Sequence, residues 1–410
     1  MAPHSKRYIP NPPAPVSLCT QPRILVVKLA SLGDVLLATP ALRALRRRYP
    51  AALLDVLTTG ASAELLRASP LVDHVYTLDK YAFDTPGDLL RRPWRLLQPV
   101  PLLAALRRND YTAVLLLHHL TLAFGRLKYR ALLAALHPRC TVGLDNGYGG
   151  FLDVRVPDLG FGDRHEAEYA RAVAEAVDAT LPARERGVRL ADLGWAEVAH
   201  QPDTMVPLVA LHPGSGGYSL ARRWPAERYA ELAGALHHDT GARVVLVGGA
   251  DERELHERIL GELRAQQAMP LPGTTWQAAS AQGTIEWATS EAGQHAPREL
   301  ARRLGECAVF VGNDSFPMHL AAAVGTPVVA IFGPSNARAW GPYVPDAPRR
   351  AVVVRRLDVP CSPCFYRGHA LGTPEGCPAR PCLTGLEMEP VLRATYRLLE
   401  ASRADAAPAG

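Results

Sequence analysis

The chain has 410 residues, 48% of them hydrophobic and 21% charged, a length and composition that predict a globular protein of about two domains. The formal net charge of +5 is too small to indicate a nucleic-acid-binding protein, and no nucleic-acid-binding motif is present. No apolar run reaches the ~18 residues of a membrane-spanning helix, and the proline-rich start lacks a signal-peptide core, so we expect a cytoplasmic protein.

The first half of the chain predicts a parallel α/β domain at residues 22–185, preceded by a disordered tail at 1–21. Its apolar runs alternate with helical stretches, as in parallel sheets. These runs predict buried strands at 23–29, 53–57, 75–78 and 113–117. In the helix after the first strand, Thr39 and Pro40 predict a kink or a restart. A stretch without strong periodicity predicts a linker at 186–206.

The second half predicts another α/β domain at residues 207–386. A strand at 208–211, a helix at 225–237 and a strand at 244–247 follow the same alternation. The Gly/Ser/Thr/Gln-rich stretch 270–295 predicts an insertion loop. An amphipathic helix at 387–402 and a tail at 403–410 complete the chain.

The stretch from Val311 to Pro334 is the most informative part of the second domain. An apolar strand ends in a polar corner, Asn313 to Ser315, and a short helix and a second strand follow. Ligands of open α/β sheets bind at the carboxyl ends of strands, and a helix N-terminus favours an anion. The pattern therefore indicates a phosphorylated or nucleotide ligand.

Three stretches together resemble glycosyltransferase family 9, the bacterial heptosyltransferases of lipopolysaccharide core assembly: Ile24 to Leu45, His212 to Tyr229, and Val311 to Pro334. Their order and spacing match the family across about residues 23–343. The resemblance implies a GT-B fold, with two Rossmann-like domains whose parallel sheets face across a cleft. It also implies inverting, metal-independent transfer of a sugar from a nucleotide-activated heptose.

In the first domain, Asp34 follows the first strand and the turn at Gly33. On the residues alone, Asp34 is best interpreted as a helix N-cap. The resemblance instead matches it to the general base that removes the proton of the acceptor hydroxyl. We assign acceptor binding to Ser31, Gly33, Arg126 and Lys128. Residues 81–140 are rich in basic side chains, which predicts either a solvated face or a surface for an acidic acceptor or an anionic membrane.

In the second domain, the glycine-containing loop that starts at His212 predicts a phosphate-binding site. Arg222 lies where the family has a lysine that contacts the leaving diphosphate, so the charge is kept and the geometry differs. Phe316 replaces the usual glycine of the donor motif, which predicts an altered donor choice. Alternatively, these residues only cap helices or form flexible loops. We assign donor binding to Gly214, Ser215, Arg222, Asp251, Glu252, Asp314, Ser315, Phe316 and His319.

Four cysteines, Cys361, Cys364, Cys377 and Cys382, follow the spacing C-x2-C-x12-C-x4-C. In a cytoplasmic protein this spacing suits a structural zinc site, and reduced structural cysteines or disulfides are the alternatives. The pair His118 and His119 near the end of a strand is unspecific, and packing is its expected role.

Together these features predict an inverting glycosyltransferase without a catalytic cofactor. Its expected partners are an ADP-sugar donor, most simply ADP-heptose, a glycan or lipid-linked acceptor, and the cytoplasmic face of the inner membrane. Asp34 and Arg222 are the predicted catalytic residues. The alternatives are a non-catalytic nucleotide-sugar-binding protein and a transferase with a different donor or acceptor. A nicotinamide-dependent oxidoreductase is disfavoured because no G-x-G-x-x-G follows the first strand of either domain.

Overall fold

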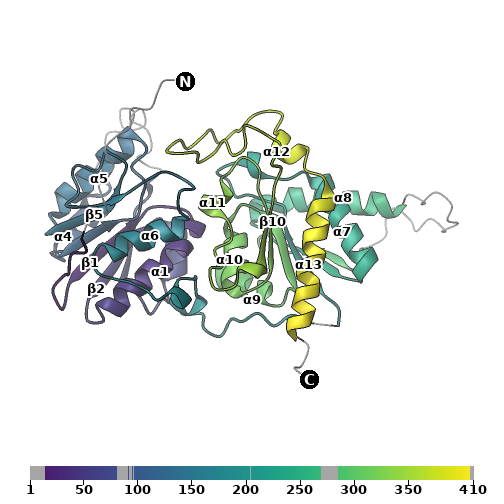
Figure 1. Cartoon of the computed structure of the whole chain (residues 1–410), viewed down its shortest axis with the longest axis horizontal. Coiled ribbons are helices and arrows are strands. Elements are labelled where there is room, and N and C mark those ends of the chain that lie inside the picture. The colour runs from purple at the N-terminus through teal and green to yellow at the C-terminus, as the bar shows by residue number, and fades with distance from the viewer. Residues whose placement is uncertain are drawn as a thin grey trace. The chain divides into compact units, whose positions relative to one another are not determined.

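The computed structural model describes residues 14–80, 91, 95, 97–203, 205–268 and 285–406 (Figure 1). The chain divides into two compact units. Unit 1 spans Met1–Ala196 and takes back the short segment Arg367–Leu371, and unit 2 holds Glu197–Tyr366 and Gly372–Gly410. The division lies inside the stretch 186–206 that the sequence predicts as a linker. The return of residues 367–371 to unit 1 was not predicted.

The described part of unit 1 is built on one parallel sheet with the strand order β3-β2-β1-β4-β5-β6. Its strands are β1 (Arg23–Lys28), β2 (Leu53–Thr58), β3 (His74–Thr77), β4 (Ala113–Leu116), β5 (Cys140–Asp145) and β6 (Val154–Pro157). Its helices are α1 (Leu32–Arg48), α2 (Gly60–Leu66), α4 (Val100–Arg107), α5 (Ala123–Leu136) and α6 (Glu166–Glu175). The central strands β1 and β4 are buried on both faces, which explains their continuous apolar runs. On one face, Leu25, Val27 and Val114 pack with residues of α4 and α5.

Helix α1 corrects one prediction, because it runs unbroken from Leu32 to Arg48 through Pro40. A proline in a helix interior removes the hydrogen bond to the carbonyl four residues earlier. That carbonyl belongs to Leu36, and the Thr39 hydroxyl donates to it at 2.9 Å. The side chain therefore replaces the missing backbone donor, and the helix does not restart at Pro40.

The described part of unit 2 repeats the parallel arrangement with the order β12-β11-β10-β7-β8-β9. Its strands are β7 (Leu208–His212), β8 (Arg243–Leu246), β9 (Ala288–Ser290), β10 (Val309–Asn313), β11 (Val328–Ile331) and β12 (Ala351–Val354). Its helices are α7 (Ala226–Thr240), α8 (Arg253–Ala268), α9 (Pro297–Gly305), α10 (Phe316–Val324), α11 (Ala337–Trp340), α12 (Pro381–Thr384) and α13 (Met388–Ala406).

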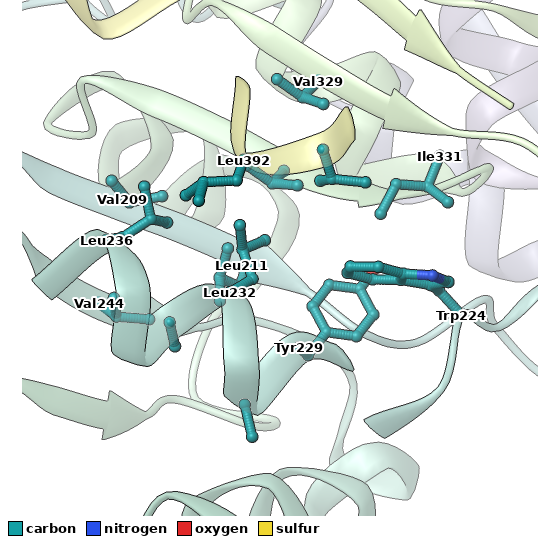
Figure 2. Packing of buried hydrophobic residues seen from close by; sticks show 14 of the residues in the cluster. Val209, Leu211, Trp224, Tyr229, Leu232, Leu236, Val244, Val329, Ile331 and Leu392 are labelled. Atoms are coloured by element: carbon teal, nitrogen blue, oxygen red, sulfur yellow. The ribbon is translucent and has the colours of Figure 1, made fainter. Parts of the chain in front are cut away.

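The core of unit 2 lies between its sheet and the helices α7, α8 and α13. Alternate strand residues point into it, and Leu392 of α13 joins Leu232 and Leu236 of α7 over the strands (Figure 2). The indole of Trp224 meets the Tyr229 ring edge to face, with ring centroids 5.0 Å apart. Trp224 thereby fixes the chain between the candidate phosphate loop and α7, as its exposed fraction of 1% indicates.

Two predicted segments differ from the structure. Helix α13 continues to Ala406, into the stretch 403–410 that the sequence predicts as a tail. Of the predicted insertion loop 270–295, residues 270–284 lie outside the described residues, and Ala288–Ser290 forms edge strand β9. Among the described residues, no helix is both long and apolar enough to cross a membrane.

Candidate active site

In unit 2, the predicted donor residues follow three neighbouring strands. Strands β10, β7 and β8 are adjacent and parallel, so their carboxyl ends share one edge of the sheet. The loop after β7 carries Gly214 and Ser215, the loop after β8 carries Asp251 and Glu252, and α10 begins after β10. The structure thus gathers most of the predicted donor residues at the ligand-binding edge of a parallel sheet.

Arg222 and Asp314 form an ion pair at this edge. Arg222 Nη1 lies 3.3 Å from Asp314 Oδ2, and Nη2 donates to the Ser215 carbonyl at 2.7 Å. The two side chains are 14% and 6% exposed. No acceptor among the described residues binds the buried Arg222 Nε. The pair joins three predicted donor residues and presents a cation that an anionic ligand can approach.

Glu252, which the sequence assigns to donor binding, is enclosed by the protein's own groups. It is 2% exposed, and it accepts hydrogen bonds from the backbone N–H groups of Ser215 (3.1 Å), Gly216 (3.3 Å) and Gly249 (3.1 Å). Burial alone would raise the pKa of Glu252, but the hydrogen bond and charge of His212 and these backbone donors lower it to about 2. The neighbouring Asp251 is exposed. Of the two acids assigned to donor binding, Glu252 is therefore a buried acceptor of backbone hydrogen bonds and Asp251 is a surface carboxylate.

Asn313 and His212 are site residues that sequence reasoning did not assign. The Asn313 amide donates to the carbonyls of Pro213 (2.8 Å) and Gly214 (3.0 Å), and its oxygen accepts from Trp224 N (3.1 Å). His212 lies between Glu252 and Ser315. Both residues end buried strands and are themselves almost fully buried, with 0% and 2% exposed. Their position at strand ends, beside the assigned residues, was the available signal.

The remaining donor residues lie on or just before α10. Ser315 precedes the helix, and its hydroxyl lies 3.0 Å from His212 Nδ1 and 3.0 Å from the Asn313 carbonyl. Phe316 is the first helical residue and is half-buried, and His319 is buried at 5% exposed. The N-terminus of α10 therefore adjoins the Arg222–Asp314 pair through the chain, with an aromatic ring at the position of the family's glycine.

In unit 1, the prediction that Asp34 is the N-cap of its helix was wrong, because Ser31 is the N-cap of α1 and Asp34 is its partner in a capping box. Asp34 is the third residue of α1 and half-buried, and its Oδ2 accepts from the Ser31 hydroxyl (2.6 Å) and backbone N–H (3.2 Å). Gly33 between them is buried. Ser31 therefore holds the Asp34 carboxylate in one orientation at the carboxyl edge of the sheet, just after β1.

The basic residues assigned to the acceptor lie on α5. Arg126 places its guanidinium 3.6 Å from the Tyr148 ring centroid and donates to the Leu120 carbonyl at 3.3 Å. The Lys128 ammonium lies 5.2 Å from the Phe124 ring centroid. Both cations are thus stacked on aromatic rings at the surface of unit 1.

The His119 side chain is buried in unit 1 and contacts two carboxylates. The sequence-based expectation of a packing role did not include these contacts. His119 Nδ1 lies 2.9 Å from Asp158 Oδ2 and its Nε2 lies 2.9 Å from Glu166 Oε1. Burial opposes protonation, yet the two carboxylates raise the pKa of His119 to about 9. His369, from the returning segment, lies 3.2 Å from Asp158 Oδ1. By contrast, burial and the charge of Lys28 lower the pKa of His118, which accepts from Leu29 N at 2.7 Å.

The four predicted metal ligands are free thiols in unit 2. Cys361, Cys364 and Cys377 are exposed, and Cys382 is buried. Burial, together with the other three cysteines nearby, raises the pKa of Cys382 to about 11. Within the described ranges, no group of three or more His, Cys, Asp or Glu side chains is arranged to hold a metal ion. The thiols are therefore neighbours without a formed ligand set.

Comparisons with known proteins agree with this architecture. The chain is 26% identical over 345 residues to "Lipopolysaccharide heptosyltransferase 2" of Salmonella typhimurium, covering 82% of this chain and 88% of the relative. Two solved structures share the GT-B fold: E. coli ADP-heptose heptosyltransferase II (TM-score 0.61, 22% identity) and an E. coli heptosyltransferase with ADP (TM-score 0.64, 19% identity). Each superposition covers 92% of this chain and 99% of the solved chain.

The family model for "Glycosyltransferase family 9 (heptosyltransferase)" matches residues 101–373, which include the loop after β7, the Arg222–Asp314 pair and the start of α10. The chain therefore belongs to glycosyltransferase family 9 and is a GT-B glycosyltransferase.

Proposed function

We propose that this glycosyltransferase moves a heptose from ADP-heptose to the lipopolysaccharide core, with inversion at the anomeric carbon and without a metal in the chemistry. The observation that carries the proposal is the Arg222–Asp314 pair beside the Ser215 loop, at the carboxyl edge of unit 2's sheet. The relative named as a lipopolysaccharide heptosyltransferase and the heptosyltransferase structure with ADP support this donor and this acceptor.

Unit 2 supplies the groups that bind the donor and its leaving group. The Arg222 guanidinium offsets negative charge that develops on the departing diphosphate. The N-terminus of α10 adds partial positive charge at the same edge. Asp314 holds Arg222 in place and offers a carboxylate to the sugar hydroxyls. Because arginine presents a planar fork instead of a point charge, this contact differs in geometry from that of the family's lysine.

Unit 1 supplies the base. The Asp34 carboxylate takes the proton from the acceptor hydroxyl as the oxygen attacks the anomeric carbon. The hydrogen bonds from Ser31 fix the orientation of this carboxylate, so capping and catalysis are compatible uses of one side chain.

The test is transfer from ADP-heptose to a heptose-deficient core acceptor by the parent protein and Asp34→Asn. We expect kcat of Asp34→Asn to fall by about 10²–10⁴-fold, the usual contribution of a general base. ADP affinity, measured by calorimetry, should stay close to the parent value because ADP binds unit 2. A folded Asp34→Asn protein that kept most of its transfer activity would remove the base assignment.

For the acceptor side, we propose that α5 lies against the anionic membrane surface that carries the lipid-linked acceptor. Leu122 and Leu127 are 60% and 59% exposed next to Arg126, Lys128 and Arg130. Exposed leucines beside cations suit an interface of acyl chains and anionic headgroups. Flotation with anionic vesicles should recover the protein, and Leu127→Ser should reduce that recovery. Equal recovery with zwitterionic vesicles would contradict the proposed attraction between the cations of α5 and anionic headgroups.

For the cysteines, we propose a structural zinc ion held by Cys361, Cys364, Cys377 and Cys382. Four thiolates are a ligand type of structural zinc sites, and because the thiols do not form a ligand set as placed, metal binding would have to deprotonate them and draw them together. Elemental analysis of protein purified under reducing conditions should give zinc in proportion to protein. Four titratable thiols in metal-free folded protein would show that the cysteines serve packing alone.

A further inference from the structure

One buried carboxylate joins the backbones of two donor-side loops. Glu252 Oε1 accepts from Ser215 N and Gly216 N in the loop after β7, and Oε2 accepts from Gly249 N in the loop after β8. Buried backbone N–H groups require acceptors. In a phosphate-binding loop such donors would point at the ligand, but here the protein's own carboxylate occupies them.

His212 extends this connection to the third loop. Its Nε2 lies 3.1 Å from Glu252 Oε2, and its Nδ1 lies 3.0 Å from the Ser315 hydroxyl that precedes α10. Because β8, β7 and β10 are neighbours, the Glu252–His212–Ser315 chain runs along the edge of the sheet. The three loops that carry the predicted donor residues are therefore tied together by side chains that are at most 7% exposed.

Two glycines of the loops are fitted to Glu252. A Cβ atom at Gly214 or at Gly248 would overlap the Glu252 carboxylate. A Cβ at Gly217, by contrast, would meet nothing within 4 Å. Glycine at position 214 thus makes room for a side chain of this protein, and the open side of the loop lies further along, at Gly217.

We propose that Glu252 and His212 are positioning residues of the donor site, which hold the Ser215 loop so that Arg222 faces the leaving diphosphate. The link passes through one residue, Ser215: Glu252 accepts from the Ser215 N–H, and the Ser215 carbonyl accepts from Arg222 Nη2 at 2.7 Å. This inference rests on the proposed function of Arg222.

The charge of Glu252 supports this role. With its pKa at about 2, the carboxylate is ionised at every pH at which the enzyme would work. Arg223 Nη2, 3.5 Å from Oε1, adds a further cation on the same side. A glutamine at this position keeps the shape but loses the charge, and its NH2 group cannot accept the backbone donors.

The experiment compares Glu252→Gln with Glu291→Gln. Glu291 is a matched control because it is also a largely buried acid of unit 2, bound to Arg303 and His295. We expect Glu252→Gln to raise KM for ADP-heptose and to weaken ADP binding roughly tenfold or more, the usual effect of losing a buried charged hydrogen bond. The KM for the acceptor should remain near the parent value. Glu291→Gln should lower Tm and keep the donor KM.

A second pair of variants tests the same role if Glu252→Gln fails to fold. Gly214→Ala should weaken ADP binding in the parent, because the new methyl group displaces the carboxylate. It should add little in a Glu252→Ala background, where that obstacle is gone. Additive effects, or parental ADP affinity in Glu252→Gln, would overturn the positioning role. If the parent protein binds ADP but transfers no heptose, the proposed function is contradicted. The ADP affinities of the variants would still test the positioning role of Glu252.

Discussion

We propose that position 222 holds the leaving group, and the resemblance to the family expects a lysine where this chain has an arginine. We predict that Arg222→Ala weakens ADP binding by roughly tenfold to a hundredfold, the range for a lost charged hydrogen bond. It should also lower kcat, since Asp314 then loses its partner. Arg222→Lys keeps the cation and should be milder in both. Calorimetry with ADP and steady-state kinetics measure the two effects. Parental ADP affinity in Arg222→Ala would assign the role to Arg223.

Phe316 stands where the resemblance to the family's donor motif expects a glycine. It is half-buried at the first position of α10, outside the fully buried core. We predict that Phe316→Gly changes the relative turnover of ADP-, GDP- and UDP-sugars more than it changes Tm. Phe316→Ala is the matched control, because it removes the ring without the helix cost of glycine, about 1 kcal/mol. The two variants should share one donor profile.

An unchanged donor profile with a large loss of Tm would make Phe316 a packing residue. A profile that broadened in both variants would instead place the ring at the donor. The non-catalytic alternative depends on the same residue: it would require that the parent protein bind ADP-sugars without turnover and that Phe316→Gly restore transfer.

At the residue scale, the motifs grouped residues that do lie together in the structure. They did not distinguish two adjacent acids whose side chains have the same chemistry. Arg222, Asp314 and Ser215 were assigned together and lie together. Asp251 and Glu252 were assigned as equivalents, although one is exposed and the other is a buried hub. Both acids follow the same strand, and Glu252 turns inward against Gly214 and Gly248, contacts that local sequence does not reveal.

At the scale of the element, α1 shows how a side chain can compensate for a backbone defect. We predict that Thr39→Val destabilises the protein by about 1–3 kcal/mol, because the buried Leu36 carbonyl then lacks a donor. Thr39→Ser keeps the hydroxyl and should cost less. Thr39 is 0% exposed, so water cannot replace the bond. Urea denaturation of both variants measures the difference, and a loss in Thr39→Val no larger than that in Thr39→Ser would contradict a stabilising role of the hydroxyl bond.

The prediction of a restart at Thr39 and Pro40 was wrong because it used local rules alone. Buried neighbours along α1 keep the helix continuous, and Thr39 supplies the donor. Strands β5, β6, β9 and β12 were also missed. Strands β6, β9 and β12 have only three or four residues, and Gly143 and Pro157 weaken the local signal of β5 and β6. The apolar strands β1 and β7 were predicted closely because strands buried on both faces have continuous apolar runs.

At the scale of the whole molecule, the order of the predicted elements indicated two parallel α/β units. It could not predict which residues distant in the sequence contact each other. Segment 367–371 joins unit 1, where Phe161 N donates to the Gly368 carbonyl at 2.6 Å. No periodicity marks such a return. Likewise, His119, Asp158 and Glu166 lie far apart in the sequence, and nothing in their local patterns shows that they meet.

This buried cluster gives unit 1 a predictable pH dependence. Because the folded state raises the pKa of His119 to about 9, from an unfolded value near 6.5, its stabilisation is complete below pH ~6.5 and disappears as the pH rises through about 9. The difference corresponds to roughly 3 kcal/mol. The pKa of Asp158 is lowered, so its contribution is lost only in acid, well outside this window.

We therefore predict that His119→Gln removes the alkaline loss of stability. Its deficit against the parent should be largest at pH 6–7, where the imidazolium would bridge two carboxylates, and should shrink toward pH 10. Hydrogen exchange of amides in β4 and α6 at several pH values would follow unit 1 separately from unit 2. His118→Gln is the control, because His118 stays neutral in this range and its loss should leave the alkaline slope intact. Parallel pH profiles for the parent and His119→Gln would show that the His119 ion pairs contribute nothing to the fold.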